Sequence, residues 1–199
     1  MPSTSNSASD PYTYPDSTVL VNLADIRDQE QVERFEAKVV YFRLVDLMLQ
    51  PITGKFDIEH LKAIHRYLFQ DVYAWAGQFR TVDISKGSTP FGFHQFVEQH
   101  LSQVLKGLTQ ERVLVGADRK KLIERVAFCM TEINAAHPFR EGNGRTQREF
   151  VRQLAFHAGY MLAWGDVDRA ELYIASGAGM RGDLAPLITI LTAITSKLS

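Results

Sequence analysis

Apolar residues recur along most of this chain at steps of three and four, the spacing of an amphipathic helix. The first such stripe consists of Val32, Phe35, Val39, Phe42, Val45 and Leu49, and we expect it to face the core. Similar stripes follow Asp57 and Asp118, where each aspartate can serve as the N-cap of a helix. The pattern therefore predicts an all-α protein built from helices of ordinary length.

Further helices are predicted in the second half and at the end of the chain. They cover residues 98–108, 145–157, 169–176 and 184–194. We found no internal repeat and no linker that would divide the chain. We therefore expect a flexible, Ser-rich start at residues 1–10 and one domain over residues 11–199.

One segment, residues 80–93, departs from the helical pattern. Val82 and Ile84 alternate with polar residues, and a Lys-Gly-Ser-Thr turn follows. This pattern predicts a small β-hairpin, which we call the flap and place at Val82, Asp83, Ile84, Ser85 and Lys86. Because an isolated hairpin is only marginally stable, the flap must pack on the helices or pair with another chain.

Composition narrows the function classes. The 199 residues carry 22 basic and 23 acidic side chains, so the basic excess of a protein that coats nucleic acid is absent. A single cysteine, Cys129, cannot form a disulfide within the chain, which suits a reducing cytoplasm. Neither a signal peptide nor a membrane span is predicted. We expect a cytoplasmic protein.

The loop "HPFREGNGR", between two predicted helices, holds the candidate chemistry. A helix N-terminus offers unpaired N–H groups and partial positive charge, and glycines let a ligand approach the backbone closely. The amides of Gly142, Asn143 and Gly144 could thus form an anion-binding nest. Arg145 and Arg148 lie in the first turn of the new helix, where an anion would offset their unfavourable interaction with the helix dipole.

Two further side chains suit a phosphate site. Glu141, just before the nest, could hold Mg²⁺, the usual companion of phosphates. His137 has an unperturbed pKa near neutrality and could accept a proton. Phe139 is expected to anchor the loop in the core, and His65 is expected at a core edge. Each element alone is common, but their combination in twelve residues favours a catalytic site.

The segment "HPFREGNGRTQR" resembles the signature of the Fic (filamentation induced by cAMP) family, H-P-F-x-[D/E]-G-N-G-R-x-x-R, at every specified position. The segments "DPYTYP", "DVYAWAGQFRTVDISKGSTPF" and "AFHAGYMLAW" are similar to small bacterial Fic toxins of the FicT type. The resemblance implies a helical Fic fold with a β-hairpin flap. It also implies AMPylation, the transfer of AMP from ATP to a hydroxyl side chain of another protein.

Roles follow from the resemblance residue by residue. His137 is the implied general base, and Glu141 holds Mg²⁺ on the α- and β-phosphates. Gly142, Asn143 and Gly144 form the anion hole, while Arg145 and Arg148 grip the outer phosphates. A target segment would add to the flap as a strand. Gly-Asn-Gly-Arg in the nest favours AMP transfer over phosphate transfer.

The same resemblance implies partners. Fic proteins are commonly restrained by a helix with the motif [S/T]-x-x-x-E-[G/N], whose glutamate pairs with the second signature arginine. This motif is not found here. We therefore expect Arg148 to be free for ATP, the chain to be a toxin, and a separate antitoxin to supply the glutamate. Similar toxins modify the ATPase subunits of DNA gyrase and topoisomerase IV.

The sequence leaves two alternative functions open. A helical protein with short helix–turn–helix joins could bind DNA through Arg145, Arg148 and Arg152, although the balanced charge argues against it. A Fic-like pseudoenzyme that only binds nucleotide is the other alternative. A pseudoenzyme would lack part of the catalytic set, whereas every position of the signature is filled in this chain.

Overall fold

A computed structural model describes residues 4–5, 10–87 and 89–198 of the chain. Its α-helices are α1 (Gln29–Leu49), α2 (Ile58–Phe69), α3 (Val97–Gln110), α4 (Arg119–Ala136), α5 (Asn143–His157), α6 (Arg169–Met180) and α7 (Ala185–Ile194). The strands are β1 (Thr4–Ser5), β2 (Ile84–Lys86), β3 (Thr89–Pro90), β4 (Tyr160–Leu162) and β5 (Thr195–Lys197), and the short helical turns are η1 (His94–Phe96), η2 (Arg112–Leu114) and η3 (Trp164–Asp166). The mostly helical fold predicted from the sequence is confirmed.

Aspartate side chains serve as N-caps of several of these helices. Asp57 accepts a hydrogen bond from the His60 amide at the start of α2, and Asp118 accepts one from the Lys121 amide at the start of α4. Both predicted caps are therefore confirmed. Each cap satisfies one of the amides that the first helical turn leaves without an intrahelical partner.

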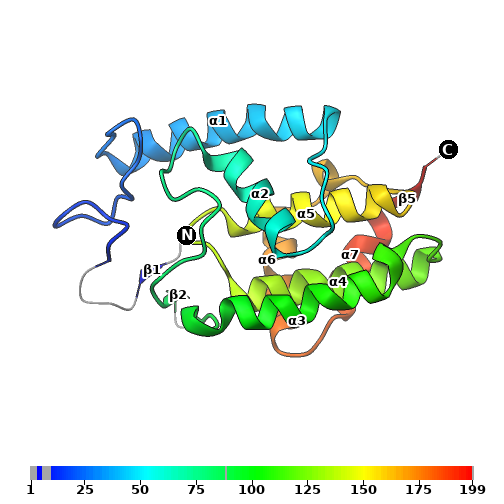
Figure 1. The fold of residues 1–199 in the computed structure, drawn as a ribbon. Coiled ribbons are helices and arrows are strands. Elements are labelled where there is room, and N and C mark those ends of the chain that lie inside the picture. Colours follow the sequence, from blue (N-terminus) through cyan, green and yellow to red (C-terminus); the bar gives the residue numbers. More distant parts are fainter. Residues whose placement is uncertain (1–3, 6–9, 88, 199) are drawn as a thin grey trace.

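Helix α5 lies in the middle of the bundle (Figure 1), with α1 and α2 on one side and α3 and α4 on the other. It packs directly against α2 and α4. Phe150 and Leu154 of α5 are fully buried, as expected for a helix covered on several sides. The loop that precedes α5 is therefore anchored at the end of the most enclosed helix.

The prediction of which face of α1 is buried is partly wrong. Val32 is buried, but Phe42 is 57% exposed and Leu49 is 77% exposed. The buried line runs instead through Val32, Glu36, Val40 and Leu47. Helix α1 carries apolar residues around most of its circumference, so periodicity could not select a face. The buried face includes an acidic residue, Glu36, whose ion-pair partner Arg145 lies in the first turn of α5.

The strands form two small antiparallel sheets. One has the order β1-β2-β3, with Ser5 opposite Ile84 and Lys86 opposite Thr89. The other pairs β4 with β5 and ties the C-terminal end of the described chain to the segment after α5. The flap is thus confirmed, and β1 from the start of the chain lies along it.

The expected flexible start falls largely outside the described residues, because only residues 4, 5 and 10 of the first ten are included. That expectation and the single domain over residues 11–199 stay predictions. In the part of the chain that the structure describes, none of the helices has the length and apolar character needed to cross a membrane.

Candidate active site

The loop between α4 and α5 has a fixed path. Helix α4 ends at Ala136, and the capping residue His137 adopts the left-handed backbone conformation with φ of 44°. The Asn143 side chain then clamps the loop, accepting from the Phe139 amide at 2.8 Å and donating to the Phe139 carbonyl at 2.7 Å. Phe139 itself is 1% exposed. It anchors the loop in the core, as predicted.

Gly142 is required by both backbone and space. Its φ is 79°, and a Cβ at this position would lie 2.2 Å from the Phe69 ring. Any other residue would be strained here and would collide with a buried aromatic ring. The glycine therefore lets the loop pass close to α2 before α5 begins.

The start of α5 presents amides suitable for an anion. The first backbone bond of the helix runs from the Thr146 amide to the Gly142 carbonyl at 3.1 Å. The amides of Asn143, Gly144 and Arg145 come before it, as in the first turn of any α-helix. The Gly142 amide donates to the Glu141 carboxylate at 2.8 Å. Of the three amides predicted to form the nest, that of Gly142 is therefore engaged by Glu141, while the Asn143 side chain holds the loop.

His137 is held between the flap and the loop. The Phe91 ring, which follows β3, stacks on the imidazole with 3.7 Å between the ring centroids. Burial lowers the pKa of His137 to about 3, assisted by the nearby charges of Arg80 and Lys86 and opposed by the Asn134 backbone. The imidazole is therefore neutral near pH 7. In that state it can accept a proton.

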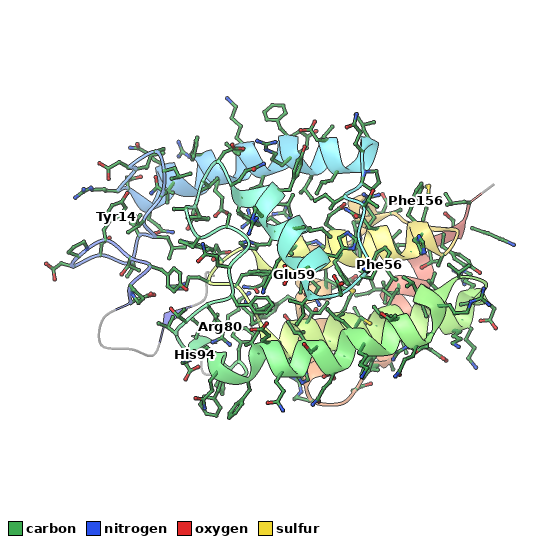
Figure 2. All side chains as sticks on the ribbon, viewed as in Figure 1. Tyr14, Phe56, Glu59, Arg80, His94 and Phe156 are labelled. Atoms are coloured by element: carbon green, nitrogen blue, oxygen red, sulfur yellow. The ribbon has the colours of Figure 1, made fainter. Side chains whose placement is uncertain are left out.

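Arg80, which is labelled in Figure 2, connects His137 to the flap through its hydrogen bonds. This buried guanidinium donates to the His137 carbonyl at 2.8 Å, the Ala136 carbonyl at 3.1 Å and the Val82 carbonyl at 2.6 Å, and also to the Gly92 carbonyl. It thereby satisfies carbonyls at the end of α4, where a cation also interacts favourably with the helix dipole. Arg80 therefore holds the backbone before the flap strand, the backbone after the hairpin and the left-handed backbone of His137 together.

Glu141 is the candidate metal ligand. Its side chain is 23% exposed, and its pKa is raised by burial and by the neighbouring Glu36 carboxylate, while Arg145 and the Gly142 amide oppose the shift. Within residues 4–5, 10–87 and 89–198, three or more His, Cys, Asp or Glu side chains do not gather to hold a metal. One carboxylate beside a candidate anion site would suit Mg²⁺, which is usually bound by one or two carboxylates together with substrate phosphates.

The two signature arginines differ in their surroundings. Arg145 lies 2.6 Å from a Glu36 oxygen and 3.5 Å from a Glu141 oxygen. Arg148 has no acidic partner among the described residues, and its pKa is lowered to about 10 by burial and by the charges of Arg145 and Arg169. An anionic ligand would relieve that repulsion. Arg148 is therefore the better placed of the two to take a phosphate.

The model of the Fic/DOC family matches residues 55–155, which is just over half of the chain. The chain belongs to the Fic/DOC family. The matched part includes α2, the flap, α4 and the whole loop before α5, and it leaves α1 outside.

Relatives of this Fic protein extend the match. It is 46% identical over 169 residues to the protein adenylyltransferase VbhT of Bartonella schoenbuchensis, covering 85% of this chain but only 35% of that protein. It is 38% identical over 188 residues to the probable protein adenylyltransferase Fic of Escherichia coli, covering 94% of this chain and 93% of that protein. The similarity therefore includes α1.

Solved structures share the fold. The BepC protein of Bartonella tribocorum, solved with bound AMPPNP, superposes with a TM-score of 0.87 at 25% identity, covering 94% of this chain and 97% of that one. An N-terminal Fic domain from Bartonella quintana, solved with bound ADP, gives a TM-score of 0.84 at 28% identity, covering 94% of this chain and 95% of that one. The helical Fic fold with its flap is thus confirmed.

The flap of this Fic domain packs on the helices. Val82 and Ile84 are buried, and Asp83 between them accepts from the His94 amide at 2.8 Å, so the predicted alternation is confirmed. Lys86 lies over the Tyr173 ring of α6 at 4.5 Å. Strand β2, which also contains Ser85, is paired with β3 on one side and with β1 on the other.

The expectation that His65 lies at a core edge is wrong. It is fully buried rather than at a core edge, and its ring stacks on Phe139 with 3.8 Å between centroids. Its Nδ1 accepts from the Gly77 amide at 2.8 Å, so Nε2 carries the proton and donates to the Glu141 carbonyl at 3.1 Å. The ring is buried because it fixes the loop backbone from α2.

Other supporting residues were not found from the sequence. Asp10 and Arg140 form an ion pair of 2.7 Å with side chains that are 8% and 5% exposed. This pair ties the segment before α1 to the loop. Glu36, Arg80 and Phe91 were also missed. The similarity of "DPYTYP" to Fic toxins drew attention to the segment that contains Asp10. Its partner Arg140 could not be identified, because it lies far away in the sequence.

Proposed function

We propose that this chain is a protein adenylyltransferase that transfers AMP from ATP to a hydroxyl side chain of another protein. The observation that carries the proposal is the position of a neutral His137 at one end of a loop whose other end presents the first-turn amides of α5 and the side chain of Arg148. The names of the relatives, protein adenylyltransferase VbhT and probable protein adenylyltransferase Fic, support the same activity.

His137 would accept the proton of the target hydroxyl. The oxygen forms a bond to the α-phosphorus, the bond between the α-phosphorus and the bridging oxygen breaks, and pyrophosphate leaves. The amides of Gly142, Asn143 and Gly144 would stabilise the charge that develops on the phosphate oxygens, and for this the Glu141 carboxylate must first release the Gly142 amide. Arg148 binds the outer phosphates. Mg²⁺ held by Glu141 would neutralise phosphate charge.

The test is transfer of label from ATP. We expect α-labelled ATP, but not γ-labelled ATP, to label a protein in a bacterial extract. His137→Ala should abolish labelling while ATP still binds, because the backbone amides at the start of α5 remain. Label from the γ-position would instead indicate phosphate transfer. Full labelling by His137→Ala would refute the role of the base.

We extend the proposal to a FicT-type toxin restrained by a separate antitoxin. Two observations support it: the sequence does not contain the motif [S/T]-x-x-x-E-[G/N], and Arg148 has no acidic partner in the described part of the chain. An antitoxin glutamate would occupy the guanidinium that the phosphate needs. The proposed targets are the ATPase subunits of DNA gyrase and topoisomerase IV, which places the activity in the cytoplasm.

Expression without an antitoxin tests this extension. The chain should arrest growth and label a gyrase or topoisomerase IV subunit, whereas His137→Ala should do neither. Normal growth with active, labelled protein would contradict the toxin role but not AMP transfer. Labelling of unrelated proteins alone would contradict the proposed targets.

The flap is proposed as the docking site for the target segment. Its position beside His137 supports this role, since Arg80 and Phe91 connect the two. The edge of β2 that an added strand would use is paired with β1. A target strand must therefore displace Thr4–Ser5 or pair with β3 instead.

DNA binding is not favoured by the arginines first considered for it. Arg152 pairs with Glu149 at 2.7 Å, and Arg145 pairs with Glu36 at 2.6 Å. Only Arg148 of that set is without an acidic partner among the described residues. Their charges are therefore largely engaged within the fold.

A further inference from the structure

Glu36 is a buried acid on α1 that contacts the candidate active site. Helix α1 lies outside the segment that the family model matches. Glu36 is 8% exposed, and the match begins at residue 55. A buried carboxylate is costly unless it is paired and hydrogen-bonded. Glu36 meets both conditions, so its partners indicate why an acid is kept there.

Each oxygen of Glu36 has its own partner. The Tyr73 hydroxyl donates to Oε2 at 2.5 Å, and Oε1 lies 2.6 Å from Nη2 of Arg145. Tyr73 is buried and stacks on Trp75 with 4.4 Å between ring centroids. Its hydroxyl therefore holds the carboxylate in a set orientation, and the carboxylate in turn holds Arg145.

Arg145 lies between two acids. The same Nη2 atom that contacts Glu36 at 2.6 Å is 3.5 Å from Oε1 of Glu141. The guanidinium also lies over the Phe69 ring at 4.8 Å. Because opposite charges in a poorly hydrated site attract strongly, Arg145 would move toward Glu141 if Glu36 did not hold it.

We propose that Glu36, oriented by Tyr73, is a positioning residue that keeps Arg145 away from Glu141 and so leaves the Glu141 carboxylate available for Mg²⁺. This inference rests on the proposed function, because it takes Glu141 as the ligand of the metal that accompanies ATP. Arg145 paired closely with Glu141 would neutralise that ligand. A divalent cation would then have to displace the guanidinium before it could bind.

The test is the gain in ATP affinity that Mg²⁺ produces, measured by calorimetry with and without the metal. Glu36→Gln should reduce this gain roughly five- to tenfold, the effect of shortening a charge pair by under one ångström at an effective dielectric constant of about 20. Tyr73→Phe should reduce it by a smaller factor. Glu33→Gln, an exposed acid on the same helix, is the matched control and should leave it unchanged.

Glu36→Asp separates positioning from charge. It retains the negative charge but is one carbon too short to hold Arg145 in place, so we expect a loss similar to that of Glu36→Gln. A wild-type Mg²⁺ effect in Glu36→Asp would mean that charge alone matters and would overturn the proposal. If Glu36→Gln does not fold, Glu36→Asp and Tyr73→Phe decide the question, and two wild-type responses would overturn it.

The outcome is distinguishable from a failure of the proposed function. A wild-type chain that binds ATP with Mg²⁺ but transfers no AMP would contradict the adenylyltransferase, while the dependence of the Mg²⁺ effect on Glu36 could still be measured. Conversely, ATP binding that does not respond to Mg²⁺ in the wild type would overturn the role of Glu36, whether or not AMP is transferred.

Discussion

The neutral histidines at the candidate site predict that acid destabilises the fold in a particular pH window. Burial lowers the pKa of His65 to about 3, against about 6.5 in an unfolded chain. Above pH 6.5 both states are neutral at this residue, so it does not change the balance. Below pH 6.5 the unfolded state binds a proton that the folded state rejects, and stability falls until the folded pKa is reached.

The magnitude follows from the width of the window. One such histidine costs about 1.4 kcal/mol per pH unit, or about 2 kcal/mol between pH 6.5 and pH 5. This range lies above the usual titration of carboxylates. His137, whose pKa is also lowered to about 3 by burial, adds a second contribution of the same sign. Together they amount to a large part of the stability of an ordinary domain.

Urea unfolding as a function of pH is the assay. The free energy of unfolding of the wild type should fall from pH 6.5 to pH 5, and His65→Gln should remove about one proton from the slope. The variant will be less stable overall, because it loses stacking on Phe139. Its difference from the wild type should nevertheless be constant between pH 7 and pH 8.5. Equal slopes below pH 6.5 would refute the buried, neutral His65.

The remaining predictions concern activity. Glu141→Gln should slow AMP transfer by roughly two to three decades and weaken its Mg²⁺ dependence; a full rate at low Mg²⁺ would make Glu141 structural. Ile84→Pro should reduce target modification while ATP affinity is retained, with Ile84→Val as control, because proline removes a strand donor; equal loss of both would limit the flap to a role in folding. Removing residues 1–9 should accelerate target modification, since β1 pairs with the flap edge; an unchanged rate with a folded protein would show that this edge is not used.

The sequence predicted the contiguous part of the site because its elements lie in one short segment. The nest, His137, Glu141 and the arginines can be read together, since a loop followed by a helix start has known consequences for amides and charge. Helix caps at Asp57 and Asp118 were equally local. These features depend on neighbours within a few residues.

Contacts between distant segments were not predictable in the same way. Glu36 lies 109 positions before Arg145 in the chain. A glutamate in an amphipathic helix is normally expected to face solvent, so nothing in the sequence indicated that it is buried. The pairing of β4 with β5 joins two segments of three residues each, which are too short to show an alternating pattern. Period alone also could not choose between the apolar faces of α1. In each case the deciding partner lies on another element.

Three residues whose positions the sequence did not predict share one property: each holds the loop before α5 from a different part of the fold. Arg80 binds the His137 carbonyl, His65 binds the Glu141 carbonyl, and Asp10 binds the Arg140 side chain. The supporting side chains of Arg80 and His65 are buried, so they hold the loop in one conformation. Catalysis by fixed amides depends on such preorganisation, because donors that need not reorient stabilise developing charge at no reorganisation cost. Gly142 therefore does not make the loop flexible; it lets the loop pass close to Phe69, and the distant polar contacts then hold the loop in place.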